Sequence, residues 1–303
     1  MRVAFFGTPA AAVPVLRAVH DAGHPVVLVV TQPERRRSRG GAPQPSPVHA
    51  AAAELGLPVR TPARAREITD ELTAGGVEAG VVAAFGQLLP APVLLAVPLG
   101  LVNLHLSLLP RWRGAAPVER AILAGDPETG ACVMRIDAGL DTGPVYRSVA
   151  TPIGLDETAG QLTERLVALG SPMLLDVLAD LPNLEPNPQR GEPTYAEKLT
   201  VDEFHLDPSR PPHELARVVR AGNPRPGAWM LVEGKRVKVL AAHAQAGGAA
   251  PGPPYDVVWP GAALRTASGR LVLDTVQVEG RRPVTGAAWL AGYRRRQLTL
   301  PVG

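Results

Sequence analysis

Three polar side chains fall on what reads as a buried strand near the middle of the chain. The segment from Gly100 to Pro110 has the sequence GLVNLHLSLLP, in which Asn103, His105 and Ser107 alternate with leucines. Successive side chains of a strand point to opposite faces, so these three groups are expected to share one face. Burying an amide, an imidazole or a hydroxyl without a partner costs roughly 1–3 kcal/mol each. The pattern favours a functional site over a polar network satisfied within a core.

A second polar segment follows at Asp137–Gly143, with the sequence DAGLDTG. It is rich in glycine, carries two carboxylates and has no hydrophobic period, so we predict a tight loop. A carboxylate placed beside His105 would favour the charged form of the imidazole and fix its orientation. Taken from the residues alone, a plain surface turn explains this segment equally well.

The elements that must position these groups alternate between strand-like and helix-like runs. This alternation predicts a parallel, doubly wound sheet with helices on both faces. In such sheets ligands bind at the carboxyl ends of the strands. No Gly-x-Gly-x-x-Gly follows the first strand and no phosphate-binding P-loop occurs, so the usual nucleotide sites lose their support. Strands are predicted at Val3–Phe6, Val26–Val30, Val81–Phe85 and Leu101–Leu106, and helices at Val48–Leu55 and around Glu67–Thr73.

The pattern changes after a stretch rich in Pro, Asn, Glu and Gln around Leu181–Pro193. Short β-branched runs separated by Gly-containing turns then predict a small β-barrel or sandwich. A last helix is expected to start with Thr285 as its N-cap and to run past Trp289 and Tyr293. With 303 residues, two domains are expected, as an α/β domain over 1–188 and a β domain over 206–303 joined by a linker over 189–205. The predicted strands are Trp229–Glu233, Arg236–Ala242, Tyr255–Trp259, Ala263–Thr266 and Arg270–Val278.

The net charge of +3 is unevenly distributed. Residues 206–303 hold 14 Lys and Arg against 6 Asp and Glu, a local charge of +8, which leaves −5 for residues 1–205. A second basic region lies in the loop from Gln32 to Pro47. Basic surfaces of this kind suit a polyanionic partner such as a nucleic acid, although a biased composition with solvated arginines explains the charge equally well. The arginines of the loop are Arg35, Arg36, Arg37 and Arg39.

Several classes of protein are disfavoured. The single cysteine, Cys132, permits no intramolecular disulfide, and no Cys/His cluster has metal-ligand spacing. No run of 18 apolar residues and no signal peptide is present, and the hydrophobic fraction of 46% is ample for packed cores. We therefore expect a globular cytoplasmic protein that uses neither a metal nor a membrane.

The pattern Asn103-x-His105, Ser107-Leu-Leu-Pro110 and then Asp141 resembles the formyl-folate transferase family. Further stretches are similar to the members of that family that formylate methionine on initiator tRNA. The resemblance covers nearly the whole chain. It implies a folate-binding Rossmann-like domain, an OB-like carboxy-terminal barrel that binds tRNA, and a basic arm that reaches the acceptor end of the tRNA. The further stretches are Phe6–Pro9, Thr31–Pro33, Pro45–Val48, Arg111–Pro117, Tyr195–Leu199 and Asn223–Pro226.

The resemblance also implies roles for individual residues. Asn103, His105 and Asp141 would be catalytic, with the co-substrate 10-formyltetrahydrofolate and the acceptor initiator methionyl-tRNA as partners of a monomer. Without the resemblance, the folate-binding segments read as ordinary core and the arginines as a solvated face. The residues expected to bind folate are Phe85, Gly86, Leu88, Ser107, Leu108, Leu109 and Pro110. Those expected to bind tRNA are Arg35, Arg36, Arg37, Arg39, Arg111 and Arg113.

One position departs from the family pattern. Leu106 stands where relatives often have Gly, and by strand alternation its side chain is expected to point away from Asn103 and His105. Three alternative functions stay open: a formyltransferase acting on an amino sugar nucleotide or another small amine, a tRNA-binding module without catalysis, and a folate-dependent hydrolase.

Overall fold

The computed structural model describes residues 1–36, 43–245, 256–258, 262–266, 268–293 and 297–299. The chain forms two compact units. Unit 1 comprises Met1–Pro117, Glu128–Pro152 and Thr163–Glu197, and unit 2 comprises Val118–Pro127, Ile153–Leu162 and Lys198–Gly303. Residues 189–205, expected to be a linker, are thus shared between the two units.

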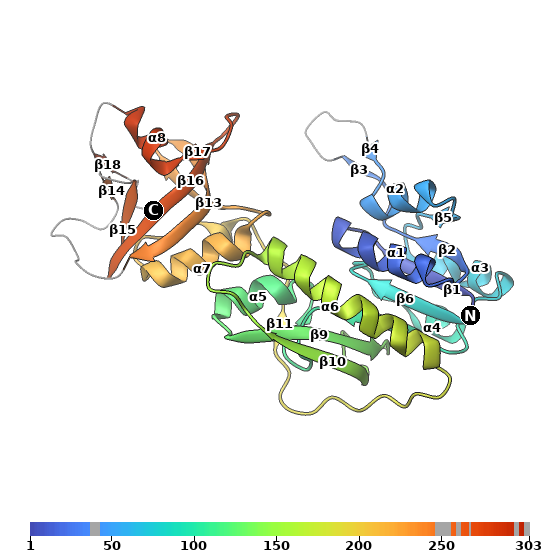
Figure 1. The fold of residues 1–303 in the computed structure, drawn as a ribbon. Helices are drawn as coiled ribbons and strands as arrows, with labels where there is room; N and C mark the ends of the chain where they lie inside the picture. Colours follow the sequence, from blue (N-terminus) through green and yellow to red (C-terminus); the bar gives the residue numbers. More distant parts are fainter. Residues whose placement is uncertain (37–42, 246–255, 259–261, 267, 294–296, 300–303) are drawn as a thin grey trace. The chain divides into compact units, whose positions relative to one another are not determined.

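Unit 1 is built on a seven-stranded sheet (Figure 1) with the order β10-β9-β7-β6-β1-β2-β5. The five strands from β7 to β5 run parallel, whereas β9 is antiparallel to β7 and β10 is antiparallel to β9. The mostly parallel sheet confirms the predicted Rossmann-like fold class, but β9 and β10 were absent from the predicted strands. The bounds are β1 (Val3–Gly7), β2 (Val26–Val30), β5 (Val59–Arg60), β6 (Ala79–Ala83), β7 (Leu101–His105), β9 (Glu128–Arg135) and β10 (Val145–Pro152).

Helices cover both faces of this sheet. One face packs against α1 (Val13–Asp21), α2 (Pro47–Glu54) and α6 (Ala159–Asp180). The other packs against η2 (Ala65–Ile68), α3 (Thr69–Ala74) and α4 (Ala91–Leu95). A short η1 (Ala10–Ala12) precedes α1, and two-stranded pairs form between β3 (Arg35–Arg36) and β4 (Pro43–Gln44) and between β8 (Arg113–Gly114) and β11 (Tyr195–Ala196).

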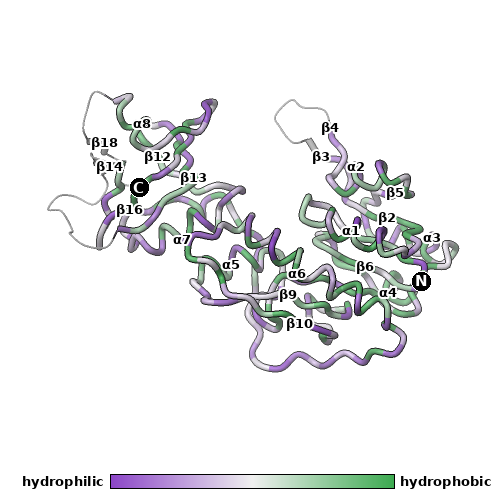
Figure 2. Tube along the Cα trace, viewed as in Figure 1, coloured by the Kyte–Doolittle hydropathy of each residue, from purple (hydrophilic) through white to green (hydrophobic). Residues whose placement is uncertain are grey.

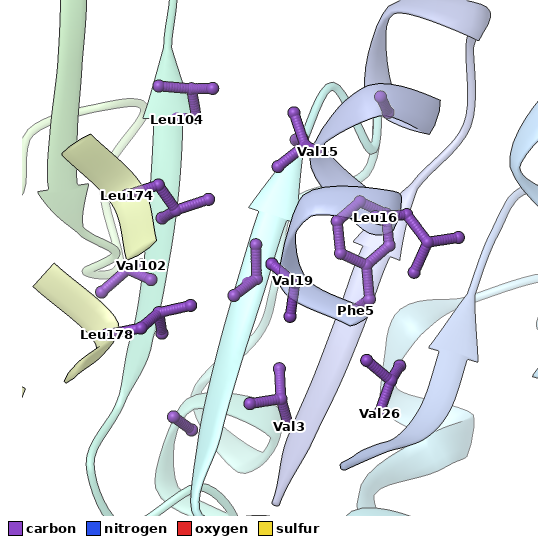
Figure 3. Packing of buried hydrophobic residues seen from close by; sticks show 14 of the residues in the cluster. Val3, Phe5, Val15, Leu16, Val19, Val26, Val102, Leu104, Leu174 and Leu178 are labelled. Atoms are coloured by element: carbon purple, nitrogen blue, oxygen red, sulfur yellow. The ribbon is translucent and has the colours of Figure 1, made fainter. Parts of the chain in front are cut away.

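The alternation along β7 decides where its polar groups point. Val102 and Leu104 pack against the α1/α2/α6 face, where Figure 3 shows them beside Leu174 and Leu178 of α6. Leu101 packs against the opposite face, which is therefore also the face of Asn103 and His105. The partly buried Leu106 packs with the first cluster, as expected, so its side chain is directed away from the polar groups.

Two predicted strands are too long at their carboxyl ends. β7 ends at His105, so Ser107 does not continue the polar face of the strand and belongs to the turn that follows. β6 ends at Ala83 instead of Phe85, because Ala84 takes a left-handed conformation with φ 48° and turns the chain out of the sheet. Both ends place loop residues at the edge of the sheet where a ligand would bind.

The carboxyl ends of β1, β6 and β7 are neighbours at this edge. The strand order reverses direction between β1 and β6, which is the position where open α/β sheets bind their ligands. Gly7 closes β1 against β6: a Cβ at this residue would lie 3.0 Å from the Ala83 carbonyl oxygen and 2.7 Å from the Phe5 ring. The close approach of the two strand ends therefore requires glycine at residue 7.

Unit 2 contains an antiparallel, curled sheet with the order β12-β13-β16-β15-β14-β18, and β17 pairs with β16. Register shifts at Ala241 let β13 bend along β16. This architecture confirms the predicted OB-like β domain. The bounds are β12 (Ala228–Val232), β13 (Lys235–Gln245), β14 (Asp256–Val258), β15 (Ala263–Thr266), β16 (Gly269–Val278), β17 (Val284–Thr285), β18 (Gln297–Thr299), η3 (Asp202–Phe204) and α7 (Pro212–Gly222). α5 (Pro117–Ala124) also lies in this unit from its second residue onward.

The last helix, α8, spans Gly286–Ala291. The Thr285 side chain accepts a hydrogen bond from the Ala288 N–H, which confirms the predicted N-cap. The helix ends before Tyr293, which was expected to lie within it, and Tyr293 packs edge-on against Trp289 instead. Within the described residues, no helix has the length and apolar character needed to cross a membrane.

The contact between α6 and the sheet yields a stability prediction. Leu174 is 1% exposed in this contact, whereas Leu169 of the same helix is 40% exposed. Leu174→Ala is expected to lower the free energy of unfolding by about 2–5 kcal/mol, because the surrounding residues cannot fill the cavity. Leu169→Ala should change it by about 0.5 kcal/mol or less. Urea denaturation followed by circular dichroism measures both, and equal effects would contradict the packing of α6.

The buried thiol of Cys132 yields a second prediction. Burial raises the pKa of this thiol from 9.0 to about 11. The folded thiol holds its proton more tightly than the unfolded one, so its contribution to stability is present below pH 9 and is lost as the pH rises toward 11. At pH 8 the thiolate fraction is about 100-fold lower in the folded protein, so iodoacetamide should label it at least that much more slowly than the urea-unfolded protein. Comparable labelling rates of the folded and unfolded protein would contradict the burial of this thiol. Cys132→Ala serves as the unlabelled blank.

Candidate active site

His105, the last residue of β7, lies at the centre of the candidate site. Its side chain is 6% exposed. Nε2 lies 2.9 Å from the carbonyl oxygen of Trp112, and Nδ1 lies 3.7 Å from Oδ2 of Asp141. A carbonyl oxygen only accepts, so Nε2 carries the proton of the first contact. The structure thus brings together His105 and Asp141, and it leaves Nδ1 as the nitrogen with the weaker contact.

The loop Asp137–Gly143 carries Asp141 back to this histidine. Its turn is closed by Asp137, whose Oδ1 accepts from the Gly139 N–H at 3.0 Å. Asp141 takes a left-handed conformation with φ 50°, and its Oδ2 accepts from the Gly114 N–H at 2.8 Å. A Cβ at Gly143 would lie 1.8 Å from the Arg135 carbonyl oxygen, so only glycine fits where the loop returns to β9. The segment is therefore a structured loop at the site, instead of a plain surface turn.

Asn103 precedes His105 on the same face of β7 and is 9% exposed. Its carboxamide makes no hydrogen bond to any described residue. The nitrogen and oxygen of this carboxamide keep some exposure to solvent, because neither is among the fully buried side-chain atoms that lack a partner. The carboxamide therefore has its two N–H donors available for a ligand beside His105.

The turn that follows β7 is stabilised from within. The hydroxyl of Ser107, which is fully buried, donates to the Arg111 carbonyl oxygen at 2.6 Å. Leu108 packs against Gly130 of β9, where a Cβ would lie 2.5 Å from a methyl carbon of Leu108. The Ser107 side chain is therefore committed to the turn itself. The other residues of this turn that were expected to bind folate are partly buried: Leu108, Leu109 and Pro110, the last following a cis peptide bond.

The loop after β6 lies at the same edge of the sheet. The Phe85 ring is buried, and its carbonyl oxygen accepts from Thr8 Oγ1 at 3.0 Å and from Gln32 Nε2 at 3.2 Å. Hydrogen bonds thus join the loops after β1, β2 and β6. Gly86, with φ 81°, is exposed, and Leu88 is 73% exposed. Of the residues expected here for folate, Gly86 and Leu88 are accessible, whereas the Phe85 side chain belongs to the core.

The basic arm is described only in part. Arg35 and Arg36 form β3, which pairs with β4, and Arg37 and Arg39 lie outside the described residues. In the described part of the arm, the β3–β4 pair begins three residues after Gln32.

The two arginines of the Arg111–Pro117 segment lie at different contacts. The Arg111 guanidinium carbon lies 4.5 Å from the centroid of the Trp112 ring. Arg113 donates from Nε and Nη2 to Oε1 of Gln189 at 3.0 and 2.6 Å. Arg111 therefore stacks on an aromatic ring, while much of the Arg113 fork is engaged within unit 1.

Sequence reasoning missed a segment of chain that stabilises the site. The stretch from α6 to β11 is drawn as mostly hydrophilic in Figure 2, and its Pro, Asn and Gln content reads as a linker. Asn187 nevertheless exchanges two backbone hydrogen bonds with Val145 at 2.8 Å each. Thr194 Oγ1 accepts from the Trp112 N–H at 2.9 Å, and Gln189 bridges Arg113 to the Asp141 loop. No compositional signal marks these contacts in the sequence.

No group of three or more His, Cys, Asp or Glu side chains in the described part of the chain could hold a metal ion. The side chains gathered at the candidate site are an amide, an imidazole and a carboxylate, from Asn103, His105 and Asp141. Two hydrogen-bond donors beside a carboxylate suit a reaction in which an oxyanion forms while a proton is moved.

Comparisons with known proteins show the family of this chain. The family model described as formyl transferase matches residues 1–178, and that described as formyl transferase, C-terminal domain, matches residues 198–294. A methionyl-tRNA formyltransferase of Thermus thermophilus is 49% identical over 295 residues, covering 97% of this chain and 96% of its own length. A methionyl-tRNA formyltransferase of Paracoccus denitrificans is 46% identical over 295 residues, covering 96% and 97%.

A solved structure extends the likeness to the fold. HypX from Aquifex aeolicus, crystallised in complex with tetrahydrofolic acid, matches with a TM-score of 0.67 at 16% identity, covering 96% of this chain and 47% of that chain. With a formyl transferase model over residues 1–178 and two relatives at 46% and 49% identity over nearly its full length, this chain belongs to the formyl transferase family, among the methionyl-tRNA formyltransferases.

Proposed function

We propose that this enzyme transfers the formyl group of 10-formyltetrahydrofolate to the amino group of methionine on initiator methionyl-tRNA, in the cytoplasm and for translation initiation. The observation that carries the proposal is the grouping of the buried Asn103 and His105 with the partly buried Asp141 at the carboxyl end of β7. Membership of the formyl transferase family supports the reaction, and the names of the full-length relatives support the acceptor.

The reaction joins an amine to a formyl carbon through a tetrahedral oxyanion. A new C–N bond forms to the methionine nitrogen, and the C–N bond to the folate nitrogen then breaks. The free N–H groups of Asn103 would donate to the oxyanion. Nε2 of His105 donates to the Trp112 carbonyl oxygen. When the imidazole is protonated on both nitrogens, its Nδ1–H would be the second donor to the oxyanion. Fixed donors of this kind stabilise the oxyanion without having to reorganise during the reaction.

Asp141 would complete the charge balance. Its carboxylate lies 3.7 Å from Nδ1 of His105, close enough to stabilise the imidazolium. The attacking amine must lose a proton and the folate nitrogen must gain one, so a net proton transfer accompanies the bond exchange. Asp141 and His105 would accept that proton from the amine and return it to the folate nitrogen.

The folate would bind along the edge formed by the loops after β6 and β7. Gly86 and Leu88 present accessible backbone and an exposed apolar side chain, and the turn at Leu108–Pro110 supplies a second apolar wall. A flat, hydrogen-bonding ring suits apolar walls with a few backbone donors and acceptors. Ser107 and Phe85 would shape this surface through the backbone, since their side chains are occupied.

The acceptor is assigned from charge as well as from relatives. An amino sugar nucleotide or a water molecule needs neither the arm arginines nor the +8 charge of residues 206–303. Binding of a tRNA does need such positive charge, because neutralising phosphates supplies much of the affinity for nucleic acids. Arg35, Arg36, Arg37, Arg39, Arg111 and Arg113 are proposed to contact the tRNA. A non-catalytic tRNA-binding module would not need Asn103, His105 and Asp141 gathered at the end of β7.

Three substitutions test the catalytic assignment. Asn103→Ala, His105→Ala and Asp141→Ala are each expected to lower kcat by about 10²–10³-fold, because each removes a donor or a charge from the transition state. Turnover is measured with saturating folate and Met-tRNA, and folding by circular dichroism. His20→Ala, on α1 and remote from the carboxyl edge, serves as the control. Near-normal turnover in any of the three variants would remove that residue from the mechanism.

The acceptor is tested by supplying alternatives in parallel. Labelled 10-formyltetrahydrofolate is incubated with the enzyme and either initiator Met-tRNA, free methionine or an amino sugar nucleotide. Label is expected only on the Met-tRNA. Label on the sugar nucleotide, or consumption of the folate without labelled tRNA, would leave the fold intact and overturn the acceptor.

A further inference from the structure

Gln189 is the residue of the α6-to-β11 segment with the most complete set of contacts. Its Nε2 donates to the carbonyl oxygens of Asp141 and Gly143 at 2.8 and 2.7 Å. Its Oε1 accepts from Nε and Nη2 of Arg113 at 3.0 and 2.6 Å. A carboxamide has two donor hydrogens and two acceptor lone pairs, so all of its hydrogen-bonding capacity is used.

These contacts fix the orientation of the side chain. The guanidinium of Arg113 can only donate and the two carbonyl oxygens can only accept, so the carboxamide fits in one of its two orientations. The positive charge of Arg113 also polarises the amide, which strengthens the two bonds that Nε2 donates. Gln189 therefore ties the Asp141 loop to the β8 strand that contains Arg113 and Gly114.

The tie acts on the main chain directly after the Asp141 side chain, at the carbonyl oxygens of Asp141 and Gly143. Asp141 has φ 50°, a conformation that residues other than glycine adopt rarely and at a cost. Its carboxylate is directed to the Gly114 N–H at 2.8 Å and lies 3.7 Å from Nδ1 of His105. Releasing the carbonyl oxygens of Asp141 and Gly143 would let the loop relax and change the distance between the carboxylate and the imidazole.

We propose that Gln189 is a positioning residue for the formyl transfer, acting through the main-chain carbonyls of Asp141 and Gly143 to hold the Asp141 carboxylate beside His105. The inference rests on the proposed catalytic roles of Asp141 and His105. The hydrogen bonds of Gln189 run to Arg113 and to main-chain carbonyls, and none of them reaches the Asp141 or His105 side chain.

Gln189→Glu separates this role from that of Arg113. The variant keeps an acceptor for the guanidinium but replaces the donor Nε2 by an oxygen that faces two carbonyl oxygens. Gln189→Met keeps the length of the side chain and removes every hydrogen bond. Both are expected to lower kcat by about 10- to 100-fold, as small displacements of catalytic groups do. KM for the folate and for Met-tRNA should change by less than about 2-fold in Gln189→Glu, since the positioned group acts on the chemical step.

A double-mutant cycle with Asp141→Asn tests whether Gln189 affects kcat through Asp141 or only through the stability of the fold. If Gln189 acts through Asp141, Gln189→Glu should cost less than about 3-fold in the Asp141→Asn background. The matched control is Gln161→Glu, because the Gln161 Oε1 accepts from the Thr158 N–H at 3.0 Å at the start of α6 and a carboxylate retains that bond. This control should keep wild-type turnover, and cooperative thermal unfolding of each variant establishes that it is folded.

Three results would overturn the inference: wild-type kcat in Gln189→Glu, a full 10-fold or larger loss that persists in the Asp141→Asn background, or a loss confined to KM. Wild-type turnover of Asp141→Asn alone would instead reject the proposed catalytic role of Asp141. Failure of the positioning role is thus read from the Gln189 variants, and failure of the catalytic role from Asp141→Asn alone.

Discussion

The contacts of one buried imidazole, that of His105, organise the candidate site in unit 1. His105 ends a parallel strand, where both faces of the sheet are covered by helices and water has little access. A ring in such a place must find polar partners, because an unsatisfied polar group costs free energy. It finds the Trp112 carbonyl on one side and the Asp141 carboxylate on the other. Both partners come from loops, so the loops must be held in place for the imidazole to be buried.

Holding these loops requires unusual backbone conformations. Trp112 and Asp141 both have positive φ, at 61° and 50°. Non-glycine residues in this region cost of order 1–3 kcal/mol each and persist only where surrounding contacts over-determine them. Here the Trp112 N–H is bound by Thr194, and the carbonyl of Asp141 is bound by Gln189. The segment that looks like a linker in the sequence therefore supplies the contacts that offset strain at the site.

The sequence predicted what depends on local pattern. Strand alternation placed Asn103 and His105 on one face and Leu106 on the other, because a period of two is encoded residue by residue. The antiparallel strands β9 and β10 were missed. β9 contains small residues such as Gly130, where a Cβ would lie 2.1 Å from the Val149 carbonyl oxygen and 2.5 Å from Leu108, so its apolar run is short and weak as a signal. The partners of Asp141 could not be predicted, since a backbone N–H or carbonyl has no signature in the sequence.

The reaction and the choice of acceptor place different demands on the chain. The proposed oxyanion and proton transfer would be the same for any amine, so the side chains at the end of β7 would not distinguish a tRNA from a small substrate. The acidic balance of residues 1–205 would even repel a polyanion, at −5 against +8 for residues 206–303. Under the proposed function, attraction of tRNA would therefore come from the arginines of the arm and from the carboxy-terminal part. Because that attraction is electrostatic, added salt should weaken binding while leaving the buried chemistry of His105, shielded from solvent, largely unchanged.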